Sequence, residues 1–177
     1  MAAAPLFTVA YPDLDAGARA RVQALRERHD PQAALIDAHF TLIFGVRDLP
    51  QTDYLAHVAA VAQTTAPIYF CCNHVQPWAG PVDADVHLFL VPDEGREAIT
   101  ALHDRLYGGP LARYLRTDLS FLPHITVGRA ADLTRAQALS DEVNAQAQPF
   151  SGRLKALTVG ALRPQGFEPL ARLPFGA

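Results

Sequence analysis

Apolar positions recur along the chain at two spacings, which alternate from one segment to the next. Short runs rich in β-branched and aromatic residues predict strands, whereas apolar residues three or four positions apart predict helices. The expected strands cover 6–10, 38–45, 68–72, 85–91, 123–128, 153–162 and 167–173. The expected helices carry Ala18, Val22 and Leu25, then Leu55, Val58, Ala59 and Ala62, then the segment 94–107, and last Ala136, Leu139 and Val143.

Turn-forming residues set the expected boundaries in the first half. The segment 12–15 should form a turn that caps the first helix, and that helix should stop near 29–31. A turn at Gly80–Pro81 should lead into the strand 85–91, so that this strand completes a hairpin or meander with the strand 68–72.

Similar signals mark the second half. The segment 108–110 contains two glycines and a proline and should break the third helix. Thr134 with Gln137 fits a capping box, so the fourth helix is expected to begin near Thr134, and Pro149 is expected to end it.

The order of elements occurs twice: strand, helix, His-x-Thr strand, helix, proline, strand, strand. His39 precedes Pro67 by 28 residues (67 − 39), and His124 precedes Pro149 by 25 (149 − 124), a difference that a surface loop can absorb. We therefore expect residues 1–177 to form one domain of two similar lobes, joined near 91–94.

The two His-x-Thr motifs are the sharpest feature of the sequence. Side chains alternate between the faces of a strand, so His39 and Thr41 should share one face, as should His124 and Thr126. The residues that alternate with them should point to the other face of each strand, toward the core: Phe40, Leu42, Ile125 and Val127. An approximate twofold axis would let the two polar faces meet across a cleft and present two imidazoles and two hydroxyls to one substrate.

This set of groups fits the cleavage of a phosphodiester. One imidazole removes a proton from the attacking oxygen and the other protonates the leaving oxygen, because the usual histidine pKa of about 6.5 allows both forms near neutral pH. Thr41 and Thr126 can donate hydrogen bonds to the non-bridging oxygens. No metal is required. A single His-x-Thr is usually structural, but two copies at matching places favour catalysis.

The motifs His39-Phe-Thr-Leu and His124-Ile-Thr-Val resemble those of the 2H phosphoesterase superfamily, especially its 2′,5′-RNA ligase and cyclic phosphodiesterase branch. The resemblance covers the chain from about Leu6 to Leu173, and the flanks Pro123 and Gly128-Arg129 are similar to those of bacterial members. It implies an α+β fold of two pseudo-twofold lobes, with two antiparallel sheets around a central cleft, helices outside and both motifs at the cleft floor.

By the same resemblance, His39 and His124 are the catalytic residues and Thr41 and Thr126 bind the phosphate. Similarity to relatives favours His124 as the base and His39 as the acid. Three residues are candidate substrate contacts near the motifs: Tyr11, Arg129 and Arg47. Further candidate platforms for a base are Trp78, Tyr107 and Phe175, although packing in the core or at the surface is the commoner role for such rings.

Charge and composition limit the substrate and the setting. The net charge of −3 suits a small cyclic nucleotide or an RNA terminus better than a long duplex. No apolar run reaches the roughly 18 to 20 residues that span a membrane, so a soluble, cytoplasmic protein is expected, with a monomer as the default. Cys71 and Cys72 are adjacent in a strand and are expected to be reduced thiols.

Other chemistries have no support in the sequence. The remaining histidines form no metal-ligand pattern: His29, His57, His74, His87 and His103. No nucleotide-binding glycine loop is present, and the sole lysine, Lys155, lies in no ligase motif, so no cofactor is expected.

The enzyme hypothesis is a metal-independent phosphodiesterase that acts on 2′,3′-cyclic or 2′,5′-linked ribonucleotide phosphates, with reversible 2′,5′ ligation as an added activity. The alternative is a non-catalytic module on the same fold that binds an RNA end or a nucleotide. An acyl-transfer hydrolase is less favoured, because the sequence lacks a nucleophile elbow. The position of the product phosphate, at 2′ or 3′, is open.

Overall fold

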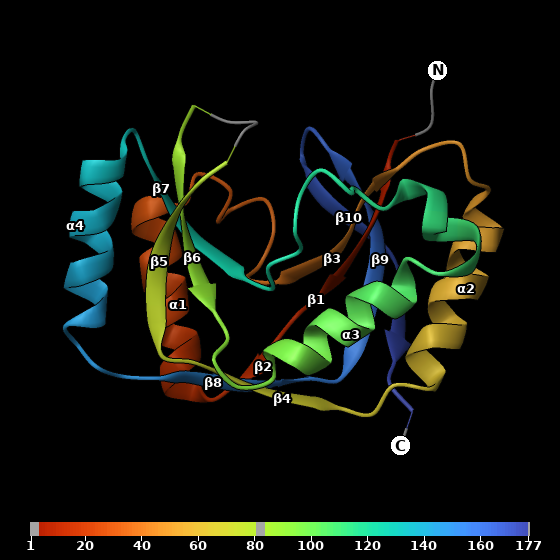
Figure 1. Cartoon of the computed structure of the whole chain (residues 1–177), viewed down its shortest axis with the longest axis horizontal. Helices are drawn as coiled ribbons and strands as arrows, with labels where there is room; N and C mark the ends of the chain where they lie inside the picture. The colour runs from red at the N-terminus through yellow and green to blue at the C-terminus, as the bar shows by residue number, and fades with distance from the viewer. Residues whose placement is uncertain (1–3, 81–83, 177) are drawn as a thin grey trace.

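A computed structural model describes residues 4–80 and 84–176, which form a mixed α and β structure (Figure 1). The strands are β1 Leu6–Ala10, β2 Asp13–Leu14, β3 Phe40–Val46, β4 Ile68–Cys72, β5 His74–Ala79, β6 Val86–Val91, β7 Ile125–Ala130, β8 Phe150–Leu154, β9 Ala156–Arg163 and β10 Gly166–Pro174. The helices are α1 Ala16–His29, α2 Gln51–Gln63, α3 Arg96–Leu106 and α4 Leu133–Asn144, with a 3₁₀ helix at Gly109–Tyr114.

A seven-stranded antiparallel sheet contains both motif strands, in the order β10-β9-β1-β3-β7-β6-β5. Its centre is the pair β3 and β7, and the strands on either side correspond in the repeat: β1 with β6, and β9 with β5. A second sheet of three strands has the order β2-β8-β4. The predicted α+β class with two antiparallel sheets is confirmed, while one domain of two lobes stays a prediction.

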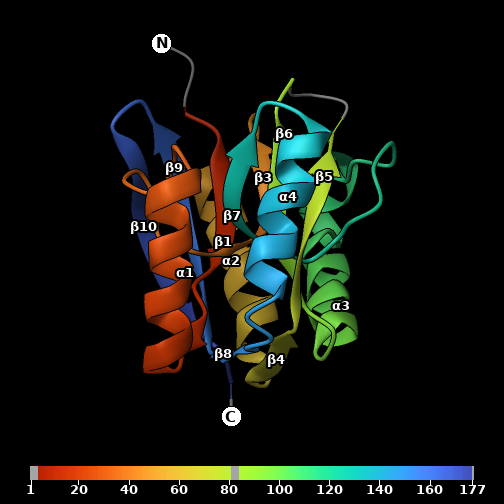
Figure 2. The same cartoon turned by 90° about the vertical axis from the view of Figure 1, so that its left-hand side faces the viewer.

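The helices follow the same symmetry. Helix α1 packs against β7, and α4 packs against β5, β6 and β7; Figure 2 shows both helices on the viewer's side of the sheet, with β7 between them. Helix α2 packs against β9 and β10, and α3 packs against β3. Each motif strand is therefore supported by a helix from the opposite half of the repeat: β7 by α1 and β3 by α3.

One core joins the sheet to the helices. The buried side chains of the motif strands belong to it: Phe40, Leu42, Ile125 and Val127. On the helices, the predicted periodicity is confirmed by buried Ala18 and Val22 in α1 and by buried Ala136 and Leu139 in α4. Both cysteines are free and buried in β4, as expected for structural thiols.

Two helix boundaries show how caps decide the ends. The Asp15 carboxylate accepts a hydrogen bond from the Ala18 amide at 2.7 Å, so the predicted start of α1 is confirmed. The predicted capping residue Thr134 is wrong, because the Asp132 carboxylate caps α4 by accepting from the Arg135 amide at 2.8 Å. The helix also ends at Asn144, well before Pro149.

Three strand predictions are corrected. The strand 68–72 lies in the smaller sheet, and the hairpin partner of β6 is β5. The sequence pattern did not predict β5 because Pro77 interrupts it. A proline is tolerated there because β5 is an edge strand. The predicted strand 153–162 is divided between β8 and β9. Part of the turn 12–15 pairs with β8 as β2. Pro81 lies outside the described residues.

None of the helices in the described part of the chain is long and apolar enough to cross a membrane.

Candidate active site

The strands β3 and β7 bring the two His-x-Thr motifs together. Each strand begins one residue after its histidine, so His39 and His124 immediately precede the strands rather than lying inside them. The predicted alternation of faces holds, because the motif histidines and threonines are half-buried while the residues between and after them are in the core.

A single register pair aligns the motifs: Phe40 is the Cα partner of Ile125. Because the strands are antiparallel, one step in each direction places Thr126 across from His39 and His124 across from Thr41. Each imidazole therefore faces the hydroxyl-bearing residue of the other motif. The pairing brings together the four predicted residues, although their motifs are 85 positions apart in sequence (124 − 39).

The two imidazoles are held in the same way. The Nδ1 of His39 lies 2.7 Å from the carbonyl oxygen of Asp37, and the Nδ1 of His124 lies 2.7 Å from the carbonyl oxygen of Leu122. A carbonyl oxygen only accepts, so each Nδ1 carries the proton and donates it. The Nε2 atom of each neutral ring is consequently left as a base, or as an acid when the ring is protonated.

Charged groups from α1 and the loop after it surround His39. Arg26 and Asp30 form an ion pair at 2.9 Å, and both side chains are only 2% exposed. Burial lowers the pKa of His39 below its usual 6.5, and the charge of Arg26 acts in the same direction. The hydrogen bond to Asp37 and the carboxylates of Asp30 and Asp37 oppose this shift. His39 is thus the histidine with acidic neighbours.

Tyr11 completes the surroundings of His39. It follows β1, and its ring meets the His39 ring edge to face, with centroids 6.3 Å apart. Burial and the charge of Asp37 raise the pKa of Tyr11 to about 12, so its hydroxyl stays protonated at neutral pH and can donate a hydrogen bond. The structure places this predicted contact residue beside the motif.

Aromatic rings surround His124 instead. The ring of Phe89 stacks on His124 with centroids 3.6 Å apart and an angle of 15°, and Trp78 stacks on Phe89 at 5.2 Å. Burial lowers the pKa of His124 to about 4, and the nearby charges of His39 and His87 add to the shift. His124 therefore stays neutral at neutral pH.

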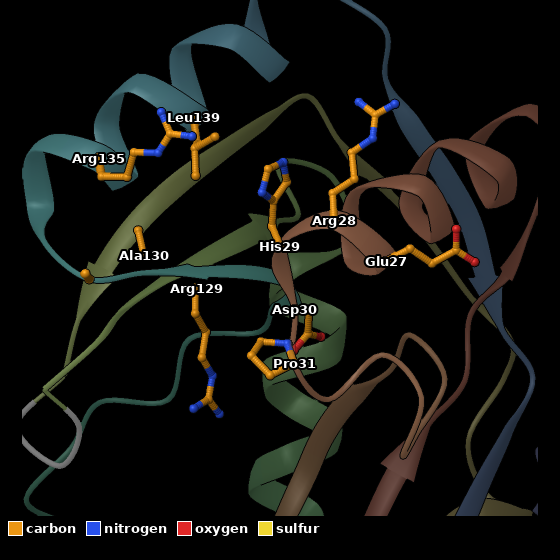
Figure 3. A pocket seen from close by; sticks show the side chains of 10 residues that line it. Glu27, Arg28, His29, Asp30, Pro31, Arg129, Ala130, Arg135 and Leu139 are labelled. Carbon is orange, nitrogen blue, oxygen red and sulfur yellow. The ribbon is translucent and has the colours of Figure 1, made fainter.

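A β-bulge in the pairing of β6 with β7 brings Arg129 to the same face. Phe89 pairs with Thr126, while His87 pairs with Arg129, because the register skips one residue of β7. The Arg129 side chain points away from Arg135 and α4, toward the other side of β7 (Figure 3). Its Nε is buried without a hydrogen-bond partner among the described residues.

Comparison with known proteins identifies the family. The profile of the 2'-5' RNA ligase superfamily matches residues 12–163. The chain belongs to this superfamily. A Bacillus pumilus (strain SAFR-032) protein named "Putative phosphoesterase" is 33% identical over 119 residues, which cover 66% of this chain and 61% of that protein. A Bacillus licheniformis protein, also described as a "Putative phosphoesterase", is 29% identical over 119 residues, which cover 66% of this chain and 62% of that protein. The chain spans about three fifths of the length of these curated relatives.

Solved structures of similar fold cover nearly the whole chain. E. coli LigT complexed with 3'-AMP has a TM-score of 0.62 at 18% identity, covering 98% of this chain and 99% of that one. TT0787 of Thermus thermophilus has a TM-score of 0.62 at 18% identity, covering 97% of both chains. These likenesses confirm the predicted α+β fold with two antiparallel sheets.

Three predicted contacts lie elsewhere in this superfamily member. Arg47 follows the far end of β3, and the seven-residue strand puts it roughly 20 Å or more from His39. Tyr107 is buried, and its hydroxyl accepts a hydrogen bond from the Phe44 amide at 3.1 Å, so it supports β3. Phe175 packs against the core. Trp78, by contrast, reaches the site through Phe89.

Sequence reading missed Phe89, His87 and the buried ion pair of Arg26 with Asp30. Only the pairing of β6 with β7 reveals that Phe89 and His87 lie on the motif face. Arg26 on α1 and Asp30, which directly follows that helix, were a readable signal, because a spacing of four residues brings oppositely charged side chains together along a helix.

Two pockets adjoin neighbours of His39: one is lined by Tyr11 and the other by Asp30. One, of about 310 Å³, is lined by Tyr11 and by residues of β9 and β10. The other, of about 420 Å³, lies between the end of α1 and the start of α4, on the outer side of β7 (Figure 3). Within residues 4–80 and 84–176, no group of three or more His, Cys, Asp or Glu side chains is placed to hold a metal ion.

Proposed function

We propose that this 2'-5' RNA ligase superfamily chain is a metal-independent phosphodiesterase. It opens 2′,3′-cyclic phosphates with water, or cleaves 2′,5′-phosphodiester bonds of RNA ends or small nucleotides by attack of the adjacent 3′-hydroxyl, which leaves a 2′,3′-cyclic phosphate and a 5′-hydroxyl. The reverse of this second reaction is 2′,5′ ligation. The observation that carries the proposal is the register of Phe40 with Ile125, which sets two equally oriented imidazoles opposite two threonines.

His124 acts as the general base. Its ring is neutral at neutral pH because burial holds its pKa at about 4, and its Nδ1 is occupied, so Nε2 accepts the proton of the attacking water. The stack on Phe89 fixes the plane of the ring. The water oxygen then forms the new bond to phosphorus.

His39 acts as the general acid. Burial lowers the pKa of His39, so its ring is protonated on the acidic side of its usual range, and the carboxylates of Asp30 and Asp37 oppose part of this shift. Its Nε2 gives a proton to the ribose oxygen as the bond from that oxygen to phosphorus breaks. The hydroxyls of Thr41 and Thr126 donate to the non-bridging oxygens and hold the phosphoryl group for in-line attack. Arg129 offers a charged fork, and Tyr11 a hydroxyl, at the edges of the same site.

The E. coli LigT structures support a nucleotide as the ligand, since they contain 3'-AMP, ATP or NADP+ in different crystals. A non-catalytic module that binds an RNA end or a nucleotide is the second candidate, because the same geometry would hold a phosphate without cleaving it. A monomer in the cytoplasm remains our expectation for either role.

Turnover of nucleoside 2′,3′-cyclic phosphates and 2′,5′-linked dinucleotides, measured with excess EDTA, tests the proposal. Cleavage that is unchanged by the chelator supports the metal-independent phosphodiesterase and names the bond. Binding of the same nucleotides without any cleavage would contradict the enzyme and favour the binding module.

A further inference from the structure

The pocket of about 310 Å³ beside Tyr11 is lined, apart from Tyr11 itself, by residues that have no role in the chemistry proposed at the two histidines. It is lined by Tyr11, Pro12, Asp13, Arg19, Lys155, Ala156, Thr158 and Arg172. Its floor is formed by β9, where Ala156 and Thr158 are buried. The cations around this floor come from three different elements: α1, the segment between β8 and β9, and β10.

The pocket is positively charged within a chain of net charge −3. Lys155 and Arg19 share one carboxylate, that of Asp13, at 2.5 Å and 3.6 Å. The guanidinium of Arg172 has no hydrogen-bond or ion-pair partner among the described residues. Three cations thus face one carboxylate, which leaves a surplus of positive charge open to an anion.

Hydrogen-bond donors predominate in the same place. Thr158 and Tyr11 contribute hydroxyls, and the Lys155 ammonium has three donors, of which the bond to Asp13 uses one. The guanidinium of Arg172 adds a planar fork that matches phosphate oxygens. A donor-rich, cationic pocket fits a phosphate better than a sugar or a base.

Strand register connects this pocket with the proposed catalytic site. Thr41 pairs with Val9, Val9 pairs with Thr158, and Thr158 pairs with Arg172. Directly paired residues share a face, so this row crosses four strands on the face of the motifs. At about 4.8 Å between strands, the Cα atoms of Thr41 and Arg172 are roughly 14 Å apart, and the long arginine side chain shortens the gap.

We propose that this pocket, built by Arg172, Lys155, Arg19, Thr158 and Tyr11, binds a second phosphate of the substrate, on the 5′ side of the nucleotide whose 2′- or 3′-phosphate lies between the histidines. The inference rests on the proposed function for the position of the first phosphate. The second phosphate is a terminal 5′-phosphate of a small nucleotide or the next phosphodiester of an RNA chain, and both present the same oxygens. Substrates with this group are preferred over simple mononucleotides.

Calorimetric binding tests the proposal without any need for turnover. The ligands are adenosine 3′-monophosphate, adenosine 3′,5′-bisphosphate and the dinucleotide ApAp, together with the corresponding 2′-phosphates. The wild type should bind at least one ligand with two phosphates about 10-fold more tightly than the monophosphate, and Arg172→Gln should remove most of that preference. Arg163→Gln is the matched control, because it removes a charge from the same hairpin outside the pocket and should keep the preference.

The ligand that gains affinity identifies the source of the phosphate. Preference for the bisphosphate indicates a terminal 5′-phosphate, and preference for ApAp indicates an RNA chain. Equal affinities in the wild type, or a preference that survives Arg172→Gln, would overturn the proposal. Absence of turnover in the wild type would count against the phosphodiesterase alone, because the second-phosphate preference is measured by binding.

Discussion

Phe40 of β3 and Ile125 of β7 are Cα partners, and the pair formed by their strands joins the two halves of the seven-stranded sheet. Both rings that flank this pair, those of His39 and His124, use Nδ1 to donate to a backbone carbonyl. The backbone is therefore nearly symmetric at this point while the surroundings differ, with carboxylates near His39 and aromatic rings against His124.

This difference predicts an acidic optimum for kcat/KM of the free enzyme. The base His124 must be neutral, so activity rises with pH through its pKa of about 4; the acid His39 must be protonated, so activity falls as pH rises through a pKa that lies below 6.5. A pH–rate profile of the wild type checks this. A profile that keeps rising above pH 7 would contradict the assignment of acid and base.

Replacing Phe89 with leucine should change the titration of His124. Phe89 is 4% exposed and covers one face of the imidazole, so its loss admits water and raises the pKa of His124 from about 4 toward 6.5. The acidic limb of the kcat/KM profile should move upward with it, and NMR titration of the ring protons measures the shift. Phe150→Leu, an equally buried phenylalanine of β8, is the control and should leave His124 unchanged. An unchanged titration in Phe89→Leu would show that the stack does not control this histidine.

The hydroxyls of the motif threonines should matter to turnover and little to the fold. Thr41→Val and Thr126→Val keep the β-branched shape that suits a strand but remove the donor to the phosphoryl oxygens, so kcat should fall about 10- to 100-fold. Thr41→Ser and Thr126→Ser keep the hydroxyl and should retain most of the activity. Steady-state kinetics decide the point, and equal losses in the valine and serine variants would contradict a role for the hydroxyl.

The buried pair of Arg26 and Asp30 should be important for stability. Arg26→Met leaves the Asp30 carboxylate buried without its partner and should lower the free energy of unfolding by about 3–5 kcal/mol, as measured by urea denaturation. The exposed pair of Arg163 and Glu168 provides the comparison, and Arg163→Met should cost no more than about 1 kcal/mol. Similar losses in the two variants would mean that the Arg26 charge is not needed in the core.

Much of this arrangement could be predicted from local sequence. Apolar periodicity located β1, α1, α2 and α3 closely, because each buries a regular stripe or face. The two His-x-Thr motifs were recognisable because strand alternation fixes the relation of His39 to Thr41 and of His124 to Thr126 without any tertiary information.

The remainder depends on contacts between distant residues. Pro77 hid the edge strand β5, and Asp132, immediately before α4, provided a cap in place of Thr134. The neighbours of the histidines come from register rather than from motif: Phe89 reaches His124 through the pairing of β6 with β7. Such long-range pairing leaves no periodic signal in a single sequence.

The most direct test of the central claim is single-turnover cleavage of a 2′,3′-cyclic nucleotide by His39→Ala, His124→Ala and the double variant, in excess EDTA. Each single variant should lose at least about 100-fold, the double variant should lose little more because the pair acts as a unit, and all should keep the wild-type melting temperature. His74→Ala, a partly exposed histidine of β5 outside the site, should keep full activity. Near-wild-type cleavage by either motif variant, or by the double variant, would contradict the two-histidine mechanism.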